Sequence, residues 1–180
     1  MFFPASEEKF DLKNMDEAKD FKELPTFIIC NPNAMVYQHM INYPHAYYLR
    51  FFSSKNINVM LWNYRGFGRS KGGRGFCCRS NDPSPENLRE DGEAVLRFCR
   101  KELGLKGKIG VYGRSLGGIA TSHLVEYVDM VFVDRSFCNL YETAYHSFHG
   151  LLAVILFKIG SYGWDSNSDE RFYNRGIKSE

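Results

Sequence analysis

The sequence lacks a surplus of charge of either sign. Its 23 Lys and Arg residues against 21 Asp and Glu residues give a formal net charge of +2. So balanced a charge gives no reason to expect nucleic acid as a partner. A local basic run lies within residues 65–79, but few aromatic residues are interleaved with it. We therefore predict a solvated loop there rather than a nucleic-acid-binding surface.

Long hydrophobic runs are also missing. The longest covers residues 151–157 and ends at Lys158, well short of the ~20 residues that a membrane-spanning helix needs. The first residues carry charges almost at once, which is not typical of a secretory signal peptide. We therefore expect a cytoplasmic protein. The apolar run favours a buried or lid-like helix, while peripheral contact with a membrane or a protein partner through residues 145–164 stays open as an alternative.

Cysteine is present but shows no pattern of a disulfide framework or a metal site. The five cysteines stand at positions 30, 77, 78, 99 and 138, so the count is odd and no C-x-x-C pair exists. Adjacent cysteines such as Cys77 and Cys78 suit neither an intrachain bridge nor zinc spacing. This usage is typical of a reducing compartment. We expect no metal and no cofactor.

Short apolar runs alternate with helical patterns through the middle of the chain. Strands are predicted over 26–30, 57–62, 108–112 and 128–133, and helices over 44–55, 84–104 and 116–127. Ser84 followed by Pro85 is a typical helix start, and Gly104 a typical end. The alternation predicts an α/β fold with a mainly parallel sheet flanked by helices, in which strand 26–30 lies between 57–62 and 108–112.

The chain divides by composition into three parts. Residues 1–24 hold eleven Asp, Glu and Lys residues and no convincing strand, so we predict a charged N-terminal segment. Residues 25–144 form the predicted α/β core. Residues 145–180 form an apolar, lid-like helical segment, which we expect to leave an exposed apolar patch beside strand 128–133.

A G-x-S-x-G pentapeptide runs from Gly113 to Gly117, between a predicted strand and a predicted helix. A strand–serine–helix turn this tight strains the backbone at Ser115 and lifts its Oγ clear of the sheet. Side chains in place of Gly113 and Gly117 would collide within the crowded turn. The start of the helix favours negative charge. We therefore predict that Ser115 is a nucleophile whose φ is near or above zero.

Four ordered stretches resemble the α/β-hydrolases, in the branch that includes lipases, depalmitoylases and serine aminopeptidase-like proteins. They are residues 28–34, 63–70, 113–118 and 131–137. The resemblance covers the central part of that fold only, so it implies an incomplete α/β-hydrolase lacking the C-terminal strands. It also implies cleavage of a carboxylic ester or thioester, of a fatty acyl chain, through an acyl-enzyme. The substrate would then be a small acyl or lipid-like molecule.

The resemblance assigns roles to residues of the motif. Ser115 would attack the carbonyl carbon, and the backbone N–H groups of Leu116 and Asn33 would hold the oxyanion. Gly113 and Gly117 would shape the elbow. The family usually has Asp where Asn63 stands, which puts the packing of that loop in question.

A histidine base and an acid are not identified, since the family places both after later strands. His146 and His149 are weak candidates for the base, and Asp134 is a weak candidate for the acid. We expect His123 to pack or cap locally. Whether the 180 residues alone are active therefore stays open. The alternative function is a non-catalytic or truncated hydrolase-like protein that acts by binding or as a structural subunit.

Overall fold

The computed structural model describes residues 1–3, 21–33, 35–42, 46–70, 83–136 and 145. Its centre is a sheet of β1 (Phe2–Phe3), β2 (Thr26–Cys30), β3 (Asn58–Leu61), β4 (Ile109–Arg114) and β5 (Met130–Asp134), in the spatial order β1-β3-β2-β4-β5. Strands β2 to β5 pair in parallel. The predicted α/β class, and the place of β2 between β3 and β4, are confirmed.

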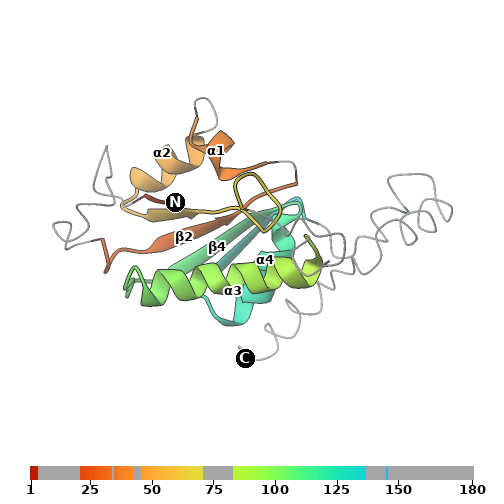
Figure 1. Ribbon diagram of the computed structural model, residues 1–180. Helices are drawn as coiled ribbons and strands as arrows, with labels where there is room; N and C mark the ends of the chain where they lie inside the picture. The colour runs from red at the N-terminus through yellow and green to blue at the C-terminus, as the bar shows by residue number, and fades with distance from the viewer. Residues whose placement is uncertain (4–20, 34, 43–45, 71–82, 137–144, 146–180) are drawn as a thin grey trace.

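Helices cover both faces of the sheet (Figure 1). The short helices α1 (Tyr37–Met40) and α2 (Tyr47–Ser53) lie on one face, and α3 (Pro85–Lys101) and α4 (Gly117–His123) on the other. Each face has its own core. The α3–α4 side buries residues that include Ile28, Val111 and Ile119. The α1–α2 side buries a smaller set around Phe27 and Phe52, whose rings stack at 4.7 Å.

Helix α3 begins where the sequence predicts. The Ser84 side chain accepts a hydrogen bond from the Asn87 N–H at 3.1 Å, and Pro85 occupies the first turn. An N-cap serine satisfies one of the N–H groups that the first turn leaves unpaired. Acidic Glu86 follows in that turn, while Arg100 and Lys101 lie in the last turn. Both ends of the helix therefore complement its dipole.

Two elements were not predicted from the sequence. The N-terminal segment contains β1, which pairs antiparallel with β3, so the prediction of no strand there was wrong. Phe2 is buried and lies 5.5 Å from the ring of Phe21. A strand of two residues has no alternation to detect, which is why the sequence missed it. Helix α1 is a single short turn in a stretch for which the sequence predicted no element.

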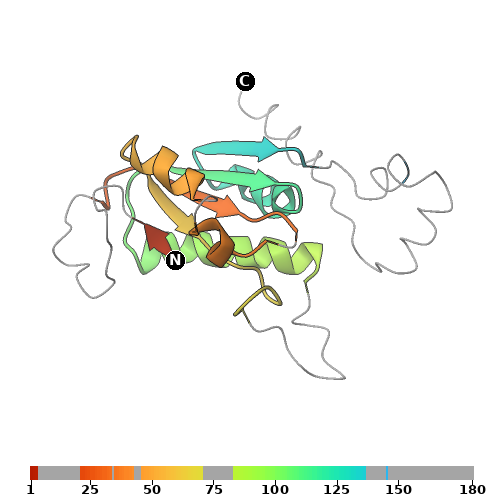
Figure 2. The same cartoon turned by 90° about the horizontal axis from the view of Figure 1, so that it is seen from above.

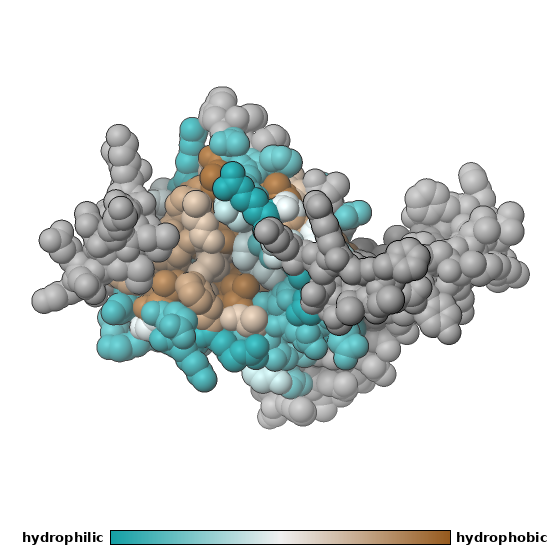
Figure 3. All heavy atoms as spheres, viewed as in Figure 1, coloured by the Kyte–Doolittle hydropathy of each residue, from teal (hydrophilic) through white to brown (hydrophobic). Residues whose placement is uncertain are grey.

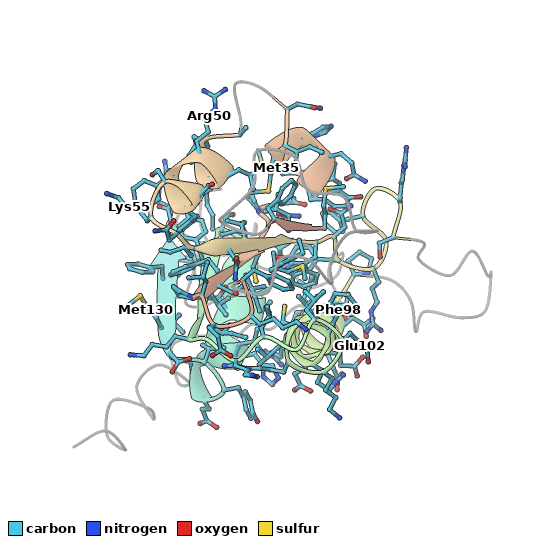
Figure 4. All side chains as sticks on the ribbon, turned by 90° about the vertical axis from the view of Figure 1, so that its left-hand side faces the viewer. Met35, Arg50, Lys55, Phe98, Glu102 and Met130 are labelled. Carbon is cyan, nitrogen blue, oxygen red and sulfur yellow. The ribbon has the colours of Figure 1, made fainter. Side chains whose placement is uncertain are left out.

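The two edges of the sheet differ in how they are covered. Figure 2 shows α2 above the middle of the sheet, with β5 at the edge away from β1. Met130 and Phe132 of β5 are about half exposed, and Figure 4 shows Met130 pointing outward there. Figure 3 shows further apolar atoms between α2 and α3, near β1. The apolar patch expected from residues 145–164 beside β5 stays a prediction.

The lid-like segment predicted over 145–180 lies outside the described residues except for Tyr145, which is exposed. The helices that the structure does describe include none long and apolar enough to cross a membrane.

Candidate active site

Ser115 lies in the tight turn between β4 and α4, with a φ of 51°. This is the left-handed region, which is costly for any residue with a Cβ and is typical of strained functional turns. Leu116 then begins the helix as its N-cap. The predicted positive φ is confirmed, and the turn has the shape of a nucleophile elbow.

Each glycine of the turn faces an atom that would not tolerate a side chain. A Cβ on Gly113 would come within 2.1 Å of Thr121 Oγ1, and one on Gly117 within 2.2 Å of the Cys30 carbonyl oxygen. A Cβ on Gly118 would meet Ser136 Oγ at 1.8 Å. Real Cβ atoms do not approach so closely, so β2, α4 and the end of β5 all pack directly on the turn. The steric prediction for Gly113 and Gly117 is confirmed.

The end of β5 holds the backbone of Ser115 from one side. The Ser115 N–H donates to the Asp134 carbonyl oxygen at 3.1 Å. In return the Ser136 hydroxyl donates to the Ser115 carbonyl oxygen at 2.8 Å. The Gly118 N–H donates to that same carbonyl at 2.9 Å. Both backbone polar groups of the strained serine are therefore satisfied, which keeps the turn in its unfavourable conformation.

The loop after β2 lies at the carboxyl end of the parallel strands, as Ser115 does. Cys30 is paired with Gly113, and the Asn31 carbonyl oxygen lies 3.1 Å from the Cβ position of Gly117. Asn33 follows in the exposed turn of this loop. No backbone carbonyl of the described residues accepts from the Leu116 N–H. The pair of oxyanion donors, Leu116 and Asn33, stays a prediction.

Asn63 organises the loops beside this edge. Its side-chain oxygen accepts from the Tyr37 N–H at 2.8 Å, and its side-chain nitrogen donates to Gln38 Oε1 at 3.0 Å. An aspartate could accept from Tyr37 but could not donate to Gln38. The family's usual Asp is thus replaced by a residue that ties both groups together. The sequence raised a question about this loop, and the structure shows it well connected.

A cluster of polar side chains surrounds the carboxylate of Asp134. The Tyr112 hydroxyl donates to Oδ2 at 2.8 Å, Arg135 Nε donates to Oδ1 at 3.0 Å, and Arg114 Nε lies 3.7 Å from Oδ2. The hydrogen bond from Arg135, followed by that from Tyr112, lowers the pKa of Asp134. Asp134 therefore stays ionised, with its carboxylate engaged by neighbours. Its role as the triad acid stays a prediction.

Tyr48 extends this cluster onto α2. Its hydroxyl donates to the Tyr112 hydroxyl at 3.1 Å. Burial raises the pKa of Tyr48 to about 12, as it does for the neighbouring Tyr47. Both phenols therefore stay protonated at neutral pH. The chain Tyr48–Tyr112–Asp134 joins α2, β4 and β5 just below the elbow.

The described histidines have other partners or lie on the surface. His123 Nε2 lies 2.6 Å from Glu93 Oε1 on α3, and the contact lowers the pKa of Glu93. This agrees with the prediction that His123 packs locally. His39 is exposed on α1. The base candidates His146 and His149 lie outside the described residues.

Cysteine and metal chemistry find no support at this site. Cys30 and Cys99 are free and buried, and burial raises the pKa of each thiol to about 12. A protonated, buried thiol is a poor nucleophile. Over the ranges that the structure describes, no group of His, Cys, Asp and Glu side chains could hold a metal ion.

Arg65 corrects the prediction for the basic loop. Instead of facing solvent, its backbone N–H and its Nε each donate to the Asp91 carboxylate at 2.8 Å. Its other nitrogens donate to Asn87 and Glu90, both at 3.0 Å. Asp91 comes first among the groups that raise the pKa of Arg65. The start of the basic run is thus fastened to α3, while residues 71–79 lie outside the described residues.

Known proteins resemble parts of this chain. Protein bem46 of Schizosaccharomyces pombe is 36% identical over 69 residues, which are 38% of this chain and 20% of that protein. An uncharacterized membrane protein of Saccharomyces cerevisiae is 26% identical over 138 residues, 74% of this chain and 42% of that protein. No family model matches the chain.

A solved structure, an alpha-beta serine hydrolase homologue from Coxiella burnetii, aligns with a TM-score of 0.45 and 23% identity. The alignment covers 60% of this chain and 49% of that one. The chain thus spans less than half the length of each of these proteins. The parallel β3-β2-β4-β5 order, with a strained serine after β4, is the arrangement that the resemblance implies. The chain therefore has an α/β fold with a mainly parallel sheet flanked by helices.

Several residues around the Ser115 turn were missed by sequence reasoning. Ser136 and Tyr112 carry hydrogen bonds that hold the elbow and the Asp134 carboxylate. Gly118 is needed because Ser136 approaches it. The third glycine of the motif was a signal that could have pointed to this contact. The contact itself depends on pairing between β4 and β5, which a single sequence does not show.

Proposed function

We propose that this chain carries the nucleophile of a serine hydrolase that cleaves a carboxylic ester or thioester of a fatty acyl chain. The observation that carries the proposal is Ser115 itself. It has a φ of 51° and sits in a turn where backbone or side-chain atoms press on all three neighbouring glycines. Such strain persists only where the surrounding structure imposes it, and it is concentrated at functional sites.

The reaction would proceed in two steps. Ser115 Oγ bonds to the carbonyl carbon and loses its proton to a histidine base, while the oxyanion accepts from the N–H groups of Leu116 and Asn33. The alcohol or thiol then leaves with a proton from that base, and water later releases the fatty acid. We keep His146 and His149 as candidates for the base and Asp134 as a candidate for the acid.

An apolar acyl group suits the surroundings of the elbow. Phe132 lies on β5, the strand whose end is hydrogen-bonded to Ser115. It is about half exposed, and its ring lies 6.0 Å from the ring of Phe27. Exposed apolar surface of this kind favours lipid chains.

The similar protein of Saccharomyces cerevisiae is described as a membrane protein. We propose a cytoplasmic protein that associates peripherally with membranes through residues 145–164, which flotation with phosphatidylcholine vesicles tests.

Hydrolysis of p-nitrophenyl acetate, octanoate and palmitate by the full chain tests the reaction and the acyl preference together. We expect the longer esters to be cleaved with the higher kcat/KM. Ser115→Ala should reduce kcat by about 10³-fold or more, as loss of a nucleophile does. Ser54→Ala is the matched control, because Ser54 is an exposed serine at the end of α2.

Two results would contradict the proposal. Equal hydrolysis by the wild type and Ser115→Ala would show that another group does the chemistry. Binding of octanoate without any turnover or acylation of Ser115 would support the alternative, a hydrolase-like protein that acts by binding.

A further inference from the structure

A second strained residue lies beside Ser115. Among the described non-glycine residues, positive φ values occur at Asn56, Ser115 and Arg135. Asparagine adopts this conformation readily, but arginine does not. Arg135 has a φ of 46° and directly follows β5, just as Ser115 directly follows β4. Two neighbouring parallel strands are therefore each followed, at their carboxyl ends, by a residue in the left-handed conformation.

The strained arginine belongs to a cluster with more positive than negative charge. Arg135 Nε lies 3.0 Å from Asp134 Oδ1, and Arg114 Nε lies 3.7 Å from Asp134 Oδ2. Arg114 directly precedes the nucleophile. The carboxylate also accepts from Tyr112, which brings no charge of its own at neutral pH. Among the described residues, two guanidinium groups thus share one carboxylate, which leaves one positive charge unbalanced next to Ser115.

Both guanidinium groups remain accessible from solvent. The side chain of Arg114 is 36% exposed and that of Arg135 is 70% exposed. Asp134, between them, is 31% exposed. A planar guanidinium offers paired donors that match the oxygens of a carboxylate or a phosphate. Two of them fixed around one carboxylate are arranged to receive a further anion.

A purely structural ion cluster in this chain has a different composition. Arg65 is one guanidinium shared by two carboxylates, those of Asp91 and Glu90. Its side chain is only 24% exposed, and its backbone is not in the left-handed region. The cluster around Asp134 has the reverse ratio of charges, greater exposure and a strained backbone. A structural role requires none of these features.

We propose that Arg114 and Arg135 bind an anionic group, a carboxylate or a phosphate, on the substrate that Ser115 cleaves. The proposal rests on the proposed function and names its substrate class. Since a fatty acyl chain carries no charge, the anion belongs to the alcohol or thiol part. The substrate is then a fatty acyl ester or thioester of a small anionic molecule or of an acidic peptide.

Matched thioesters test this directly. Octanoyl thioesters of mercaptoethanol, 3-mercaptopropionate and 2-mercaptoethyl phosphate differ in the charge of the leaving thiol, which is neutral, a carboxylate or a phosphate. We expect the wild type to cleave one of the anionic thioesters with about tenfold higher kcat/KM than the neutral one. The thioester that is cleaved faster shows whether the anionic group of the substrate is a carboxylate or a phosphate.

Variants assign the preference to the two arginines. Arg114→Gln and Arg135→Gln should each remove most of this preference, so that the ratio of kcat/KM for the anionic thioester to that for the neutral thioester falls toward one. Arg114→Lys and Arg135→Lys should restore part of the preference. Arg97→Gln is the matched control, because Arg97 pairs with Glu93 within α3. A urea midpoint for each variant shows that it is folded. A preference for anions that survives both glutamine variants, or the absence of any preference, would overturn the proposal.

Binding separates this proposal from the proposed function. Titration of Ser115→Ala with inorganic phosphate and with succinate reports the arginine site without any chemistry. We expect Ser115→Ala to bind the preferred anion as tightly as the wild type, and the added Arg135→Gln change to weaken binding about tenfold. Binding that depends on the arginines in a chain that cleaves no thioester would support this site and contradict the proposed reaction. Cleavage of the thioesters without arginine-dependent anion binding would support the proposed reaction and contradict the anion site.

Discussion

Strands β4 and β5 are neighbours that end alike but are covered differently. Each is followed by a non-glycine residue with positive φ, Ser115 after β4 and Arg135 after β5. Most of β4 is buried, whereas Met130, Phe132 and Val133 of β5 are between 43% and 52% exposed. The same local geometry is therefore found after a buried strand and after a strand that is half exposed.

The difference shows how a strained turn can be held. At the end of β4 the Cys30 carbonyl and the Thr121 side chain leave no space beside the glycines, so the turn cannot relax without moving β2 or α4. At the end of β5 the Asp134 carboxylate accepts hydrogen bonds from Tyr112 and Arg135. The Ser136 hydroxyl donates to the Ser115 carbonyl oxygen, so it helps to hold the turn after β4 as well. Packing fixes the turn at Ser115, while the polar side chains after β5 lie where we propose that an anionic group binds.

The largest effect is expected at the packed turn. Gly113→Ala and Gly117→Ala each place a Cβ within about 2.2 Å of a neighbouring atom, and the resulting overpacking should lower the free energy of unfolding by about 3 kcal/mol. Urea unfolding followed by circular dichroism measures the change. Gly92→Ala is the control, because its Cβ would meet ordinary contacts at 3.4 Å inside α3. There the better helix propensity of alanine should leave stability equal or higher.

A directly paired set of valines compares the two strands themselves. Val111 of β4 is fully buried, and its partner across the ladder, Val131 of β5, is half-buried. Val111→Ala should lower the free energy of unfolding by about 2 kcal/mol, and Val131→Ala by about 1 kcal/mol or less. Equal costs in urea unfolding would mean that β5 is as well covered as β4.

Removing the backbone strain at Ser115 should stabilise the chain. Ser115→Gly relieves the left-handed conformation and should raise the free energy of unfolding by about 1 kcal/mol while abolishing any esterase activity. Thermal unfolding measures the gain. Asn56→Gly serves as the reference, because asparagine tolerates its φ of 55° and the gain there should be smaller. A loss of stability in Ser115→Gly would show that the Ser115 side chain contributes more than its strain costs.

The polar end of β5 predicts a small pH effect. Hydrogen bonds from Arg135 and Tyr112 lower the pKa of Asp134 below its ordinary value of 3.8. A carboxyl whose folded pKa is lowered adds stability above its unfolded pKa and loses it as the pH falls through the folded value. The urea midpoint of the wild type should therefore exceed that of Asp134→Asn at pH 6, with the difference shrinking below pH 3.8. A difference that is constant with pH would contradict the ion cluster.

Much of the sheet could be predicted from the sequence because β2, β3 and β4 are short apolar runs separated by clear helix and turn signals. Ser84 and Pro85 gave the start of α3, and the glycines around Ser115 gave its positive φ. The hydrophobic pattern of residues 128–133 also predicts a strand, and β5 confirms it, although Met130, Phe132 and Val133 are about half exposed. The pattern of apolar residues indicates where a strand forms, but it does not show which segments pack against that strand.

The rest of the site depends on contacts between distant segments. The bonds from Ser136 to Ser115 and from Tyr112 to Asp134 arise because β4 and β5 are neighbours in register. The attachment of Arg65 to Asp91 likewise depends on how α3 packs. None of these pairs has a signature in sequence spacing. The strain at Arg135 could not be predicted either, because nothing in the residues after β5 marks a left-handed turn.

Labelling of the full chain with a fluorophosphonate probe, followed by mass spectrometry of the labelled peptide, tests the central claim most directly. The probe reacts with a serine that is activated as a nucleophile. Our account predicts one labelled residue, Ser115, with labelling abolished in Ser115→Ala and unchanged in Ser54→Ala. Labelling at another serine, or none at Ser115 under conditions that label a known serine hydrolase, would contradict it.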